Sequence, residues 1–476
     1  MMSGISVKRL MALGVSGLLA LTMAAGCSGG GDTSSNTSKT PGNSQGGDPS
    51  STVVEKPAMD LKGRVIEVRM FGGLETFTEE DGAYYNSVKE TEEKYKCTFN
   101  FVEMPILDLI AAVEQAHLAG VAEFDVAMVE GYHAVPKMAV SKQYLNLSEY
   151  YDFSADAEWQ NDVIKDVGVY QGNRYAFPIG GSSDMGIFYN KALMREANLE
   201  DPWTYVENDT WNFENFKKFA KALTKDSNND GTPEQFGFVA EETFEQFIVA
   251  NGGALIDASG DAPTFVGGDE NGMEAINFVL GMYDERIIPT TDDMANAGIN
   301  SAFNGMATGK VAMFPYGAGY GPYLIDEVGM APEDVGWIYF PKGPKATEYV
   351  APILTPQNMF MVLADVEKPE EVVGAMQDMM CFWSETKASK TTYEELRQES
   401  ANADVNLDFL TGNNLTVYMD LTDKAVCVNT LSYTAARDLI KTMFYDIQTK
   451  ALTPAAAMDT YKGQIQSAID SLVNPQ

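Results

Sequence analysis

Apolar and polar residues follow one another near the start of the chain in a pattern that predicts strands and helices in turn. Residues 64–71 (RVIEVRMF) and 97–102 (CTFNFV) are predicted strands, and residues 82–96 and 106–119 are predicted helices. Residues 124–129 (FDVAMV) form a continuous apolar run, as in a strand buried on both faces of a parallel sheet. This βαβ succession predicts an α/β lobe.

A second pattern, in residues 172–191 (GNRYAFPIGGSSDMGIFYNK), places two short apolar runs on either side of a series of small residues. The runs cover residues 175–179 and 185–189. Glycine lacks the Cβ atom that restricts the backbone, so the segment between the runs has unusual conformational freedom. Two buried strands joined in this way predict a crossing between two lobes.

The rest of the chain continues as mixed helix and strand. A helix is expected to begin at Thr210 as its N-cap, with Trp211 packed against its apolar stripe. Further strands are expected at residues 311–314, 335–341 and 359–363, and further helices at 369–384 and 455–472.

The composition of the chain excludes several classes of function. A chain of 476 residues exceeds a single core, so two or more domains are expected. The net charge of −35 argues against nucleic-acid binding, which needs a basic face. The chain has only two histidines and shows no nucleophile elbow, HExxH or phosphate-binding loop motif. We therefore expect no catalytic residue, no metal site and no cofactor.

The N-terminus has the pattern of an export signal. Lys8 and Arg9 precede an apolar run over residues 10–25 that is short for a membrane span. Small residues stand directly before Cys27 and resemble the lipobox of bacterial lipoproteins, which implies cleavage after residue 26 and acylation of Cys27. Residues 27–58 are then the lipidated cysteine and a disordered tether, because they contain almost nothing to bury.

The cysteines do not form a disulfide framework. Cys97, Cys381 and Cys427 are an odd number at wide spacing, although one bridge between Cys381 and Cys427 is an open alternative.

A polar loop offers a second open alternative. Asp226, Asn228 and Asp230 copy the first half of a calcium loop, but position twelve is Gly237 instead of a bidentate glutamate. The segment is therefore either a calcium site or a polar turn with side-chain hydrogen bonds.

Candidate ligand-binding residues follow the predicted strands. Ligands of open α/β sheets lie at the carboxyl ends of strands, where this chain has Glu75 after the first strand and Glu130 and Tyr132 after the third. Tyr316 and Tyr320 stand in a Gly-rich loop and offer aromatic rings to the C–H face of a sugar.

Five segments, taken together and in order, resemble a known family. They read YAFPIGG, IFYNKALMREANL, TWNFENFKKFAKALT, DSNNDGTPEQFGF and AFNGMATGKVAM. The chain resembles the family 1 extracellular solute-binding proteins, the maltose-binding-protein-like lipoproteins of ABC importers, over nearly all of residues 60–476.

The resemblance implies a type II periplasmic-binding-protein-like fold, with two α/β lobes and the ligand in the cleft between them. The first lobe would comprise residues 60–181 plus 341–386, and the second residues 182–340 plus 387–476. The family's sugar-contacting loops map onto Gly72 to Glu75, Glu130 to His133, Ser182 to Asp184, which includes Ser183, and Tyr316 to Tyr320, with Asn358 near the ligand. Family members usually have a tryptophan where this chain has Tyr316 and Tyr320.

The resemblance further implies capture by lobe closure without chemistry. The partners would be a carbohydrate, the ABC permease subunits and the membrane, the last through the lipid anchor alone, with a monomer at the extracellular face of the cell membrane. A neutral mono- or oligosaccharide is favoured because the mapped loops contain no Arg or Lys. The alternatives are a peptide, a polyol phosphate or another small solute in the same fold, a surface sensor or adhesion lipoprotein, and a secreted glycosidase.

Overall fold

Alternating burial along the first strand shows how the sequence builds the first sheet. The computed structural model describes residues 59–474 except 81, 132–133, 161–163, 180–184, 241, 259, 261, 354–357, 404–405, 422–423, 429 and 431. In β1 (Arg64–Met70), Ile66, Val68 and Met70 are buried and the residues between them face outward. This period of two is the pattern of a strand with one face against a core.

The first sheet has five strands in the order β2-β1-β3-β13-β6. β1 runs parallel to β2 (Cys97–Glu103) and to β3 (Val126–Val129), as the βαβ pattern predicted. β13 (Met359–Val362) comes from much later in the chain and runs antiparallel to both β3 and β6 (Phe177–Pro178). A strand from the far half of the chain is therefore inserted between β3 and β6.

Helices cover this sheet on both faces. Val88 of α2 (Tyr85–Tyr95) and Val372 of α14 (Pro369–Met380) join Ile66 and Val68 in one core cluster. Leu109 of α3 (Ile106–Ala119) joins a separate cluster with Ala127 and Val129. Two core clusters around one sheet make a three-layer α/β lobe.

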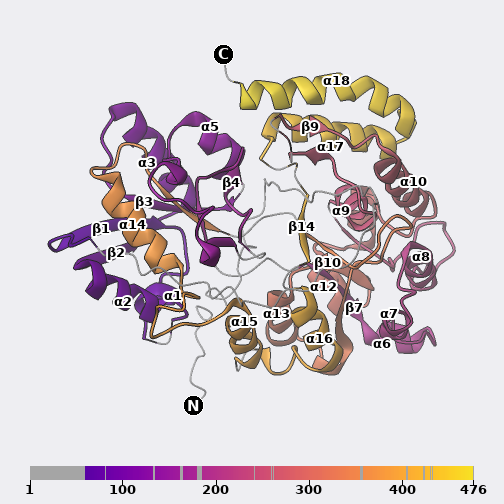
Figure 1. Cartoon of the computed structure of the whole chain (residues 1–476). Helices are drawn as coiled ribbons and strands as arrows, with labels where there is room; N and C mark the ends of the chain where they lie inside the picture. Colours follow the sequence, from indigo (N-terminus) through magenta and orange to yellow (C-terminus); the bar gives the residue numbers. More distant parts are fainter. Residues whose placement is uncertain are drawn as a thin grey trace, which may run out of the picture.

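A second sheet is the centre of the other lobe (Figure 1). Its order is β10-β7-β11, and β10 (Met313–Tyr316) and β11 (Val335–Ile338) are both antiparallel to β7 (Gly186–Asn190). Every residue of β7 is buried. The fold is thus mixed α/β with two lobes, as predicted.

Several segments cross between the lobes. β6 belongs to the first sheet and β7 to the second, so residues 180–184 join the two sheets, and the predicted crossing is confirmed. β12 (Ala351–Ile353) precedes β13 and pairs in parallel with β14 (Ala425–Cys427), which lies between the lobes in Figure 1. The predicted limits of the two lobes stay a prediction.

The remaining elements surround these sheets. The first lobe also has α1 (Glu75–Thr78), α5 (Ala139–Ser141), β4 (Val169–Tyr170) and β5 (Asn173–Arg174). The others are α6 (Lys191–Glu196), α7 (Trp203–Glu207), α8 (Phe213–Ala222), α9 (Thr243–Ala250), β8 (Ile256–Asp257), β9 (Thr264–Phe265), α10 (Glu270–Asp284), α11 (Thr291–Ala297), α12 (Ala302–Ala307), α13 (Gly321–Asp326), α15 (Tyr393–Asn402), α16 (Gly412–Asp420), α17 (Thr434–Gln448) and α18 (Pro454–Val473). In the described ranges, none of the helices has both the length and the apolar character needed to cross a membrane.

The structure corrects the predicted start of α8. Its N-cap is Asn212, whose side-chain oxygen accepts a 3.0 Å hydrogen bond from the backbone N–H of Asn215. Thr210 was the wrong choice, because its hydroxyl donates instead to the carbonyl oxygen of Tyr205. Trp211 packs as predicted, since it is fully buried and its Nε1 donates to the carbonyl oxygen of Tyr339.

The thiol of Cys381 is free and buried, as is that of Cys97. The alternative of a bridge between Cys381 and Cys427 is therefore not realised in this structure.

Candidate functional site

The carboxyl ends of β1 and β3 meet at one edge of the first sheet. Glu75 begins α1 shortly after β1, and Glu130 directly follows β3; both are half-buried. Because β1 and β3 are parallel neighbours, the structure brings these two predicted residues to the same edge, as the sequence reasoning required. Tyr132, Ser183, Asp184 and Cys27 lie outside the described residues.

Asn358 lies at this edge as well. The antiparallel register pairs Met359 with Val129, so Asn358 lies opposite Glu130. Its backbone carbonyl accepts a 3.0 Å hydrogen bond from the N–H of Ile179, the residue before the central crossing. Its side-chain Oδ1 is buried and has no hydrogen-bond partner in the described part of the chain. We call Glu75, Glu130 and Asn358 the polar edge.

Aromatic residues gather at the other end of the crossing. The ring of Tyr316 lies 4.4 Å from that of Tyr320 and 5.1 Å from that of Phe303, measured between centroids, and Tyr323 lies 5.5 Å from Phe303. We call these four residues the aromatic cluster. Burial and the neighbouring Tyr316 raise the pKa of Tyr320, so its phenol stays neutral at physiological pH.

The central crossing connects the polar edge to the aromatic cluster. Ile179 lies beside Asn358, and the register of the second sheet pairs Gly186 with Tyr316. A fully extended chain from residue 179 to residue 186 spans at most about 25 Å. Gly186 is required here, because a Cβ atom would come within 2.5 Å of the Trp337 ring. The chain thus keeps Ile179 and Gly186, which border the two groups, within about 25 Å of each other.

The sequence reasoning missed a cluster of charged residues at α9 and α17, in which Glu245 and Arg437 are buried and Glu242 and Lys441 are partly exposed. Arg437 Nη2 lies 2.6 Å from Glu242 Oε1, and Lys441 Nζ lies 3.1 Å from the same oxygen. Glu245 accepts a 3.2 Å hydrogen bond from the hydroxyl of Thr430. We call Glu242, Glu245, Arg437 and Lys441 the buried charge cluster.

Burial within this cluster changes the ionisation of Glu245. Glu245 is 1% exposed and Arg437 is 3% exposed. Burial, together with the nearby carboxylate of Glu242, raises the pKa of Glu245 to about 8. A signal was present in the sequence: residues 243–250 (TFEQFIVA) place a glutamate inside an otherwise mostly apolar helix.

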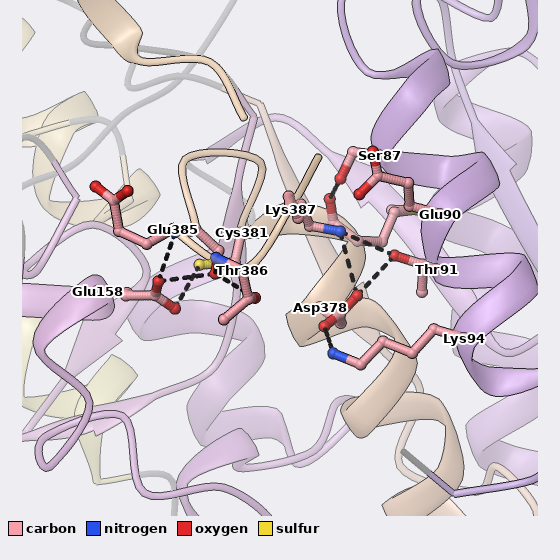
Figure 2. Close-up of polar contacts among 12 residues, drawn as sticks. Ser87, Glu90, Thr91, Lys94, Glu158, Asp378, Cys381, Glu385, Thr386 and Lys387 are labelled. Atoms are coloured by element: carbon pink, nitrogen blue, oxygen red, sulfur yellow. Dashed lines mark hydrogen bonds and ion pairs between the residues drawn. The ribbon is translucent and has the colours of Figure 1, made fainter. Parts of the chain in front are cut away.

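A different polar group joins α2 to α14 in the first lobe (Figure 2). Lys387 Nζ lies 3.2 Å from Asp378 Oδ2 and 3.3 Å from the hydroxyl of Thr91, and Lys94 pairs with the other oxygen of Asp378. Burial opposes ionisation of Asp378, but Lys387 and Lys94 together hold its pKa below the usual value. An open pocket of about 390 Å³ lies beside these residues.

Polar groups in the segment that follows α14 have partners as well. Glu158 accepts hydrogen bonds from Ser384 Oγ at 2.7 Å and from the backbone N–H of Glu385 at 3.0 Å (Figure 2). Burial, with Glu158 nearby, raises the pKa of the Cys381 thiol well above its ordinary value, which makes the thiol unreactive. We therefore assign this region a structural role.

The polar loop after α8 brings three carboxylates together. Ligand atoms of Asp226, Asp230 and Glu234 all lie within 4.8 Å of one another. The loop is also held by its own hydrogen bonds, because Asp226 accepts from the N–H of Gly231 and Asn228 accepts from the N–H of Asp230. These bonds are those of the polar turn. Asp230 is exposed and Asp226 and Glu234 are partly buried, and the three carboxylates alone assign no metal.

The comparisons with known proteins agree with this geometry. The model of the family described as bacterial extracellular solute-binding protein matches residues 76–377. The search of curated proteins gave no match.

Solved structures show the same fold. An ABC substrate-binding protein from Listeria monocytogenes in complex with cycloalternan is 17% identical, with a TM-score of 0.56 over 86% of this chain and 99% of that one. A sugar transporter from Rhizobium etli in an open conformation is 12% identical, with a TM-score of 0.60 over 86% and 99%. An ABC transporter solute-binding protein from Thermotoga lettingae, bound with α-D-tagatose, is 15% identical, with a TM-score of 0.55 over 86% and 100%.

Proposed function

Because the chain belongs to the family of bacterial extracellular solute-binding proteins, we propose that it captures a carbohydrate between its two lobes and delivers it to an ABC importer. The observation that carries this proposal is the central crossing, which joins the polar edge to the aromatic cluster. Carboxylates and amides suit hydroxyl groups, and aromatic rings suit the C–H face of a sugar.

The proposed contacts divide between the lobes. Glu75, Glu130 and Asn358 would accept hydrogen bonds from hydroxyl groups, and the unpaired Oδ1 of Asn358 is suited to this role. Tyr316 and Tyr320 would pack against the ring. We also propose Tyr132, Ser183 and Asp184 as ligand contacts, because the sugar-contacting loops of the family map onto them. Mutagenesis of each residue can test this.

The proposed mechanism is closure around the ligand. A ligand that contacts both lobes binds the closed form better and shifts a pre-existing equilibrium between open and closed forms. The permease subunits would then recognise the closed form. No bond in the ligand is made or broken, so incubation of the protein with oligosaccharides should leave them intact.

Anchoring is a separate part of the proposal. Acylation of Cys27 would hold the protein at the extracellular face of the cell membrane, with residues 27–58 as a tether and the folded part as a monomer. Fractionation of cells tests this: the wild-type chain should sediment with membranes, and Cys27→Ser should not. A Cys27→Ser variant that stays with the membranes would remove the lipid anchor from the proposal.

Thermal melting of the full chain in mild detergent tests the binding function. A panel of mono- and oligosaccharides is added, and binding to the native state alone raises stability by about 2.7 kcal/mol at a hundred times the dissociation constant. A rise with one class of sugar supports the proposal. If no saccharide changes the midpoint and a peptide or another small solute does, the fold carries a different cargo. Loss of uptake on gene deletion distinguishes transport from surface sensing.

A further inference from the structure

Exposed apolar side chains gather on one face of the first lobe. Single exposed apolar residues are normal on a protein surface, but a group of them on one face marks an interaction site. Five of the ten large apolar side chains that are exposed among the described residues belong to β1, β2, α3 and the segment after α3. We call these five residues the α3 face: Val65, Val102, Leu107, Leu118 and Val121.

Part of this face is a sheet surface that α3 does not cover. The parallel register pairs Val68 with Phe101 and Arg69 with Val102. Val68 and Phe101 belong to the core under α2 and α14. Side chains alternate along a strand, so Val102 and Val65 point to the other side of the sheet, the side of α3. The core cluster under α3 includes residues of β3 and β13 but, among the described residues, none of β1 or β2.

α3 adds an exposed apolar stripe to the face. Successive residues of a helix turn by about 100°, so Leu107, Ala111 and Leu118 lie along one side of α3. All three are exposed, Leu107 at 77% and Leu118 at 86%, whereas Leu109 and Val113 of the same helix are buried. The helix is therefore apolar on two sides, and the fold buries only one of them.

The α3 face extends from the polar edge to the end of the lobe where the proposed tether begins. Glu103, at the end of β2, accepts a 3.1 Å hydrogen bond from the N–H of Leu74 in the loop before α1, and Leu107 follows at the start of α3. α3 then runs back for about 21 Å, so Leu118 lies near the amino ends of the strands. The described chain begins at residue 59, directly before β1, at these same amino ends. A partner on this face would thus contact both the side of the sugar site and the side of the tether.

The charge of the face limits the kind of partner. Residues 106–124 contain Asp108, Glu114 and Glu123, all exposed, and no Lys or Arg. A second copy of the chain fits poorly, because two such faces would bring like charges together and each chain has a net charge of −35. An anionic lipid surface would be repelled for the same reason. A protein surface with apolar side chains flanked by Lys or Arg matches both the stripe and the acids.

We propose that the α3 face docks the transmembrane subunit of the ABC importer, through an extracellular loop that carries apolar side chains flanked by Lys or Arg. The inference rests on the proposed function, in which the importer is the partner, and adds the surface that meets it. A random coil of the length of the proposed tether spans roughly 30 Å, so the anchored protein stays within reach of an integral membrane protein. Five apolar side chains are few beside the about 20–30 residues of a stable interface, as suits a contact that forms and breaks in each transport cycle.

Sugar uptake by cells, compared with sugar binding by the purified full chain, tests the inference. The gene is deleted and replaced by variants, and uptake of the sugar identified by thermal melting is measured below saturation. The double variant Leu107→Gln and Leu118→Gln should lower uptake roughly tenfold, because two apolar contacts are lost, and should leave sugar affinity unchanged. Both side chains are exposed in the native protein, so the variant should fold. The matched control is Leu407→Gln, since Leu407 is 52% exposed between α15 and α16 and lies outside the face.

A charge reversal tests the basic character of the partner. Glu114 lies on the same side of α3 as the apolar stripe, and Glu114→Lys should lower uptake roughly threefold to tenfold by repelling Lys or Arg of the importer. The matched control is Glu399→Lys, at an exposed position of α15, which should leave uptake unchanged. Unchanged uptake in Glu114→Lys would overturn a basic partner.

Site-directed photocrosslinking in intact cells identifies the partner directly. p-Benzoyl-phenylalanine is introduced into the full chain in place of Leu118, or in place of Leu407 as the control, and adducts are identified by mass spectrometry. The expected adduct at position 118 is the transmembrane subunit of an ABC importer. An adduct with a second copy of the chain, or no protein adduct at position 118, overturns the inference.

Failure of the inference and failure of the proposed function are distinguishable. Normal uptake by the double leucine variant overturns the inference and leaves the proposed function standing. Reduced sugar affinity in that variant also overturns it, because the face would then act on the sugar site. If no saccharide binds the wild-type chain but the importer subunit is crosslinked at position 118, the carbohydrate cargo fails and the docking surface stands.

Discussion

Ser432 Oγ donates a 2.6 Å hydrogen bond to the carbonyl oxygen of Val135, and this bond joins the start of α17 to the segment that follows β3. Both residues are buried, Ser432 at 2% exposure and Val135 at 6%. The two lobes are therefore linked by a side chain as well as by the crossing strands.

We expect Ser432→Ala to weaken this link and lower the free energy of unfolding by about 1–3 kcal/mol, because the buried carbonyl of Val135 loses its partner. Hydrogen exchange should speed up together in residues 134–141 and 432–437, which lie in different lobes. Ser471→Ala is the control, since Ser471 donates to the carbonyl of Ser467 at an exposed position of α18. Faster exchange in only one of the two segments would contradict a link between the lobes.

The aromatic cluster should contribute to sugar affinity through its rings. Tyr316→Ala is expected to weaken binding roughly tenfold, from the loss of about 1.5 kcal/mol of ring contact. Tyr316→Phe keeps the ring and should retain most of the affinity. Tyr445→Ala serves as control, because Tyr445 is 64% exposed on α17. Titration with the sugar found by thermal melting measures all three, and equal loss in Tyr316→Phe and Tyr316→Ala would assign the effect to the hydroxyl.

The polar group between α2 and α14 should stabilise the first lobe. Asp378→Asn leaves Lys387, whose side chain is 5% exposed, without its anionic partner, and we expect a loss of about 3–5 kcal/mol in urea unfolding. The pKa of Asp378 is lowered in the folded state, so its contribution is present above pH 3.8 and is lost as the pH falls below it. The wild-type protein should therefore lose more stability in acid than the variant does.

Asp209→Asn is the matched control for this prediction. Asp209 pairs with Lys342 but is 74% exposed, so its removal should cost less than about 1 kcal/mol. If Asp378→Asn is no more destabilising than Asp209→Asn, the group in Figure 2 is not a stabilising centre.

Glu245 should make stability fall as the pH rises. Its folded-state pKa of about 8 lies above the ordinary value of 4.5, so its contribution is complete below pH 4.5 and is lost as the pH rises through 8. Among the described residues, the charged groups that act on Glu245 are Glu242 and Arg437. Lys441 and Tyr283, whose pKa is raised by burial, interact with Glu242. Urea unfolding at pH 5, 6.5 and 8 should show a decline in the wild type that Glu245→Gln reduces. Parallel declines in both proteins would count against ionisation of Glu245.

The sequence predicted those elements whose patterns are local. β1, α3 and the closing helix α18 were found within a residue or two, because apolar periodicity and capping residues lie within each segment. The central crossing was found for the same reason, since two apolar runs and a series of small residues are contiguous. The N-cap of α8 was misplaced because Thr210 and Asn212 are both good capping residues, and the tertiary contact of Trp211 decides between them.

Relationships between distant segments were less predictable. Glu75 and Glu130 were each named from a strand end and Asn358 from the family resemblance, but the register that sets Asn358 opposite Glu130 depends on antiparallel insertion of β13. The buried charge cluster was missed because Glu245 and Arg437 lie far apart in sequence and each is set among apolar residues. A buried charge inside an apolar helix is the one local sign of such a site.

β13 lies far along the sequence from the other strands of its sheet, and this position also fixes the order in which a growing chain can fold. The second sheet is complete once Ile338 has been synthesised, whereas the first sheet must wait for Val362. The sheet that begins first is therefore finished last, and until then β3 has an unpaired edge that other chains could join. A fragment that ends before residue 359 should consequently aggregate, and the amino-terminal lobe cannot be produced by simple truncation.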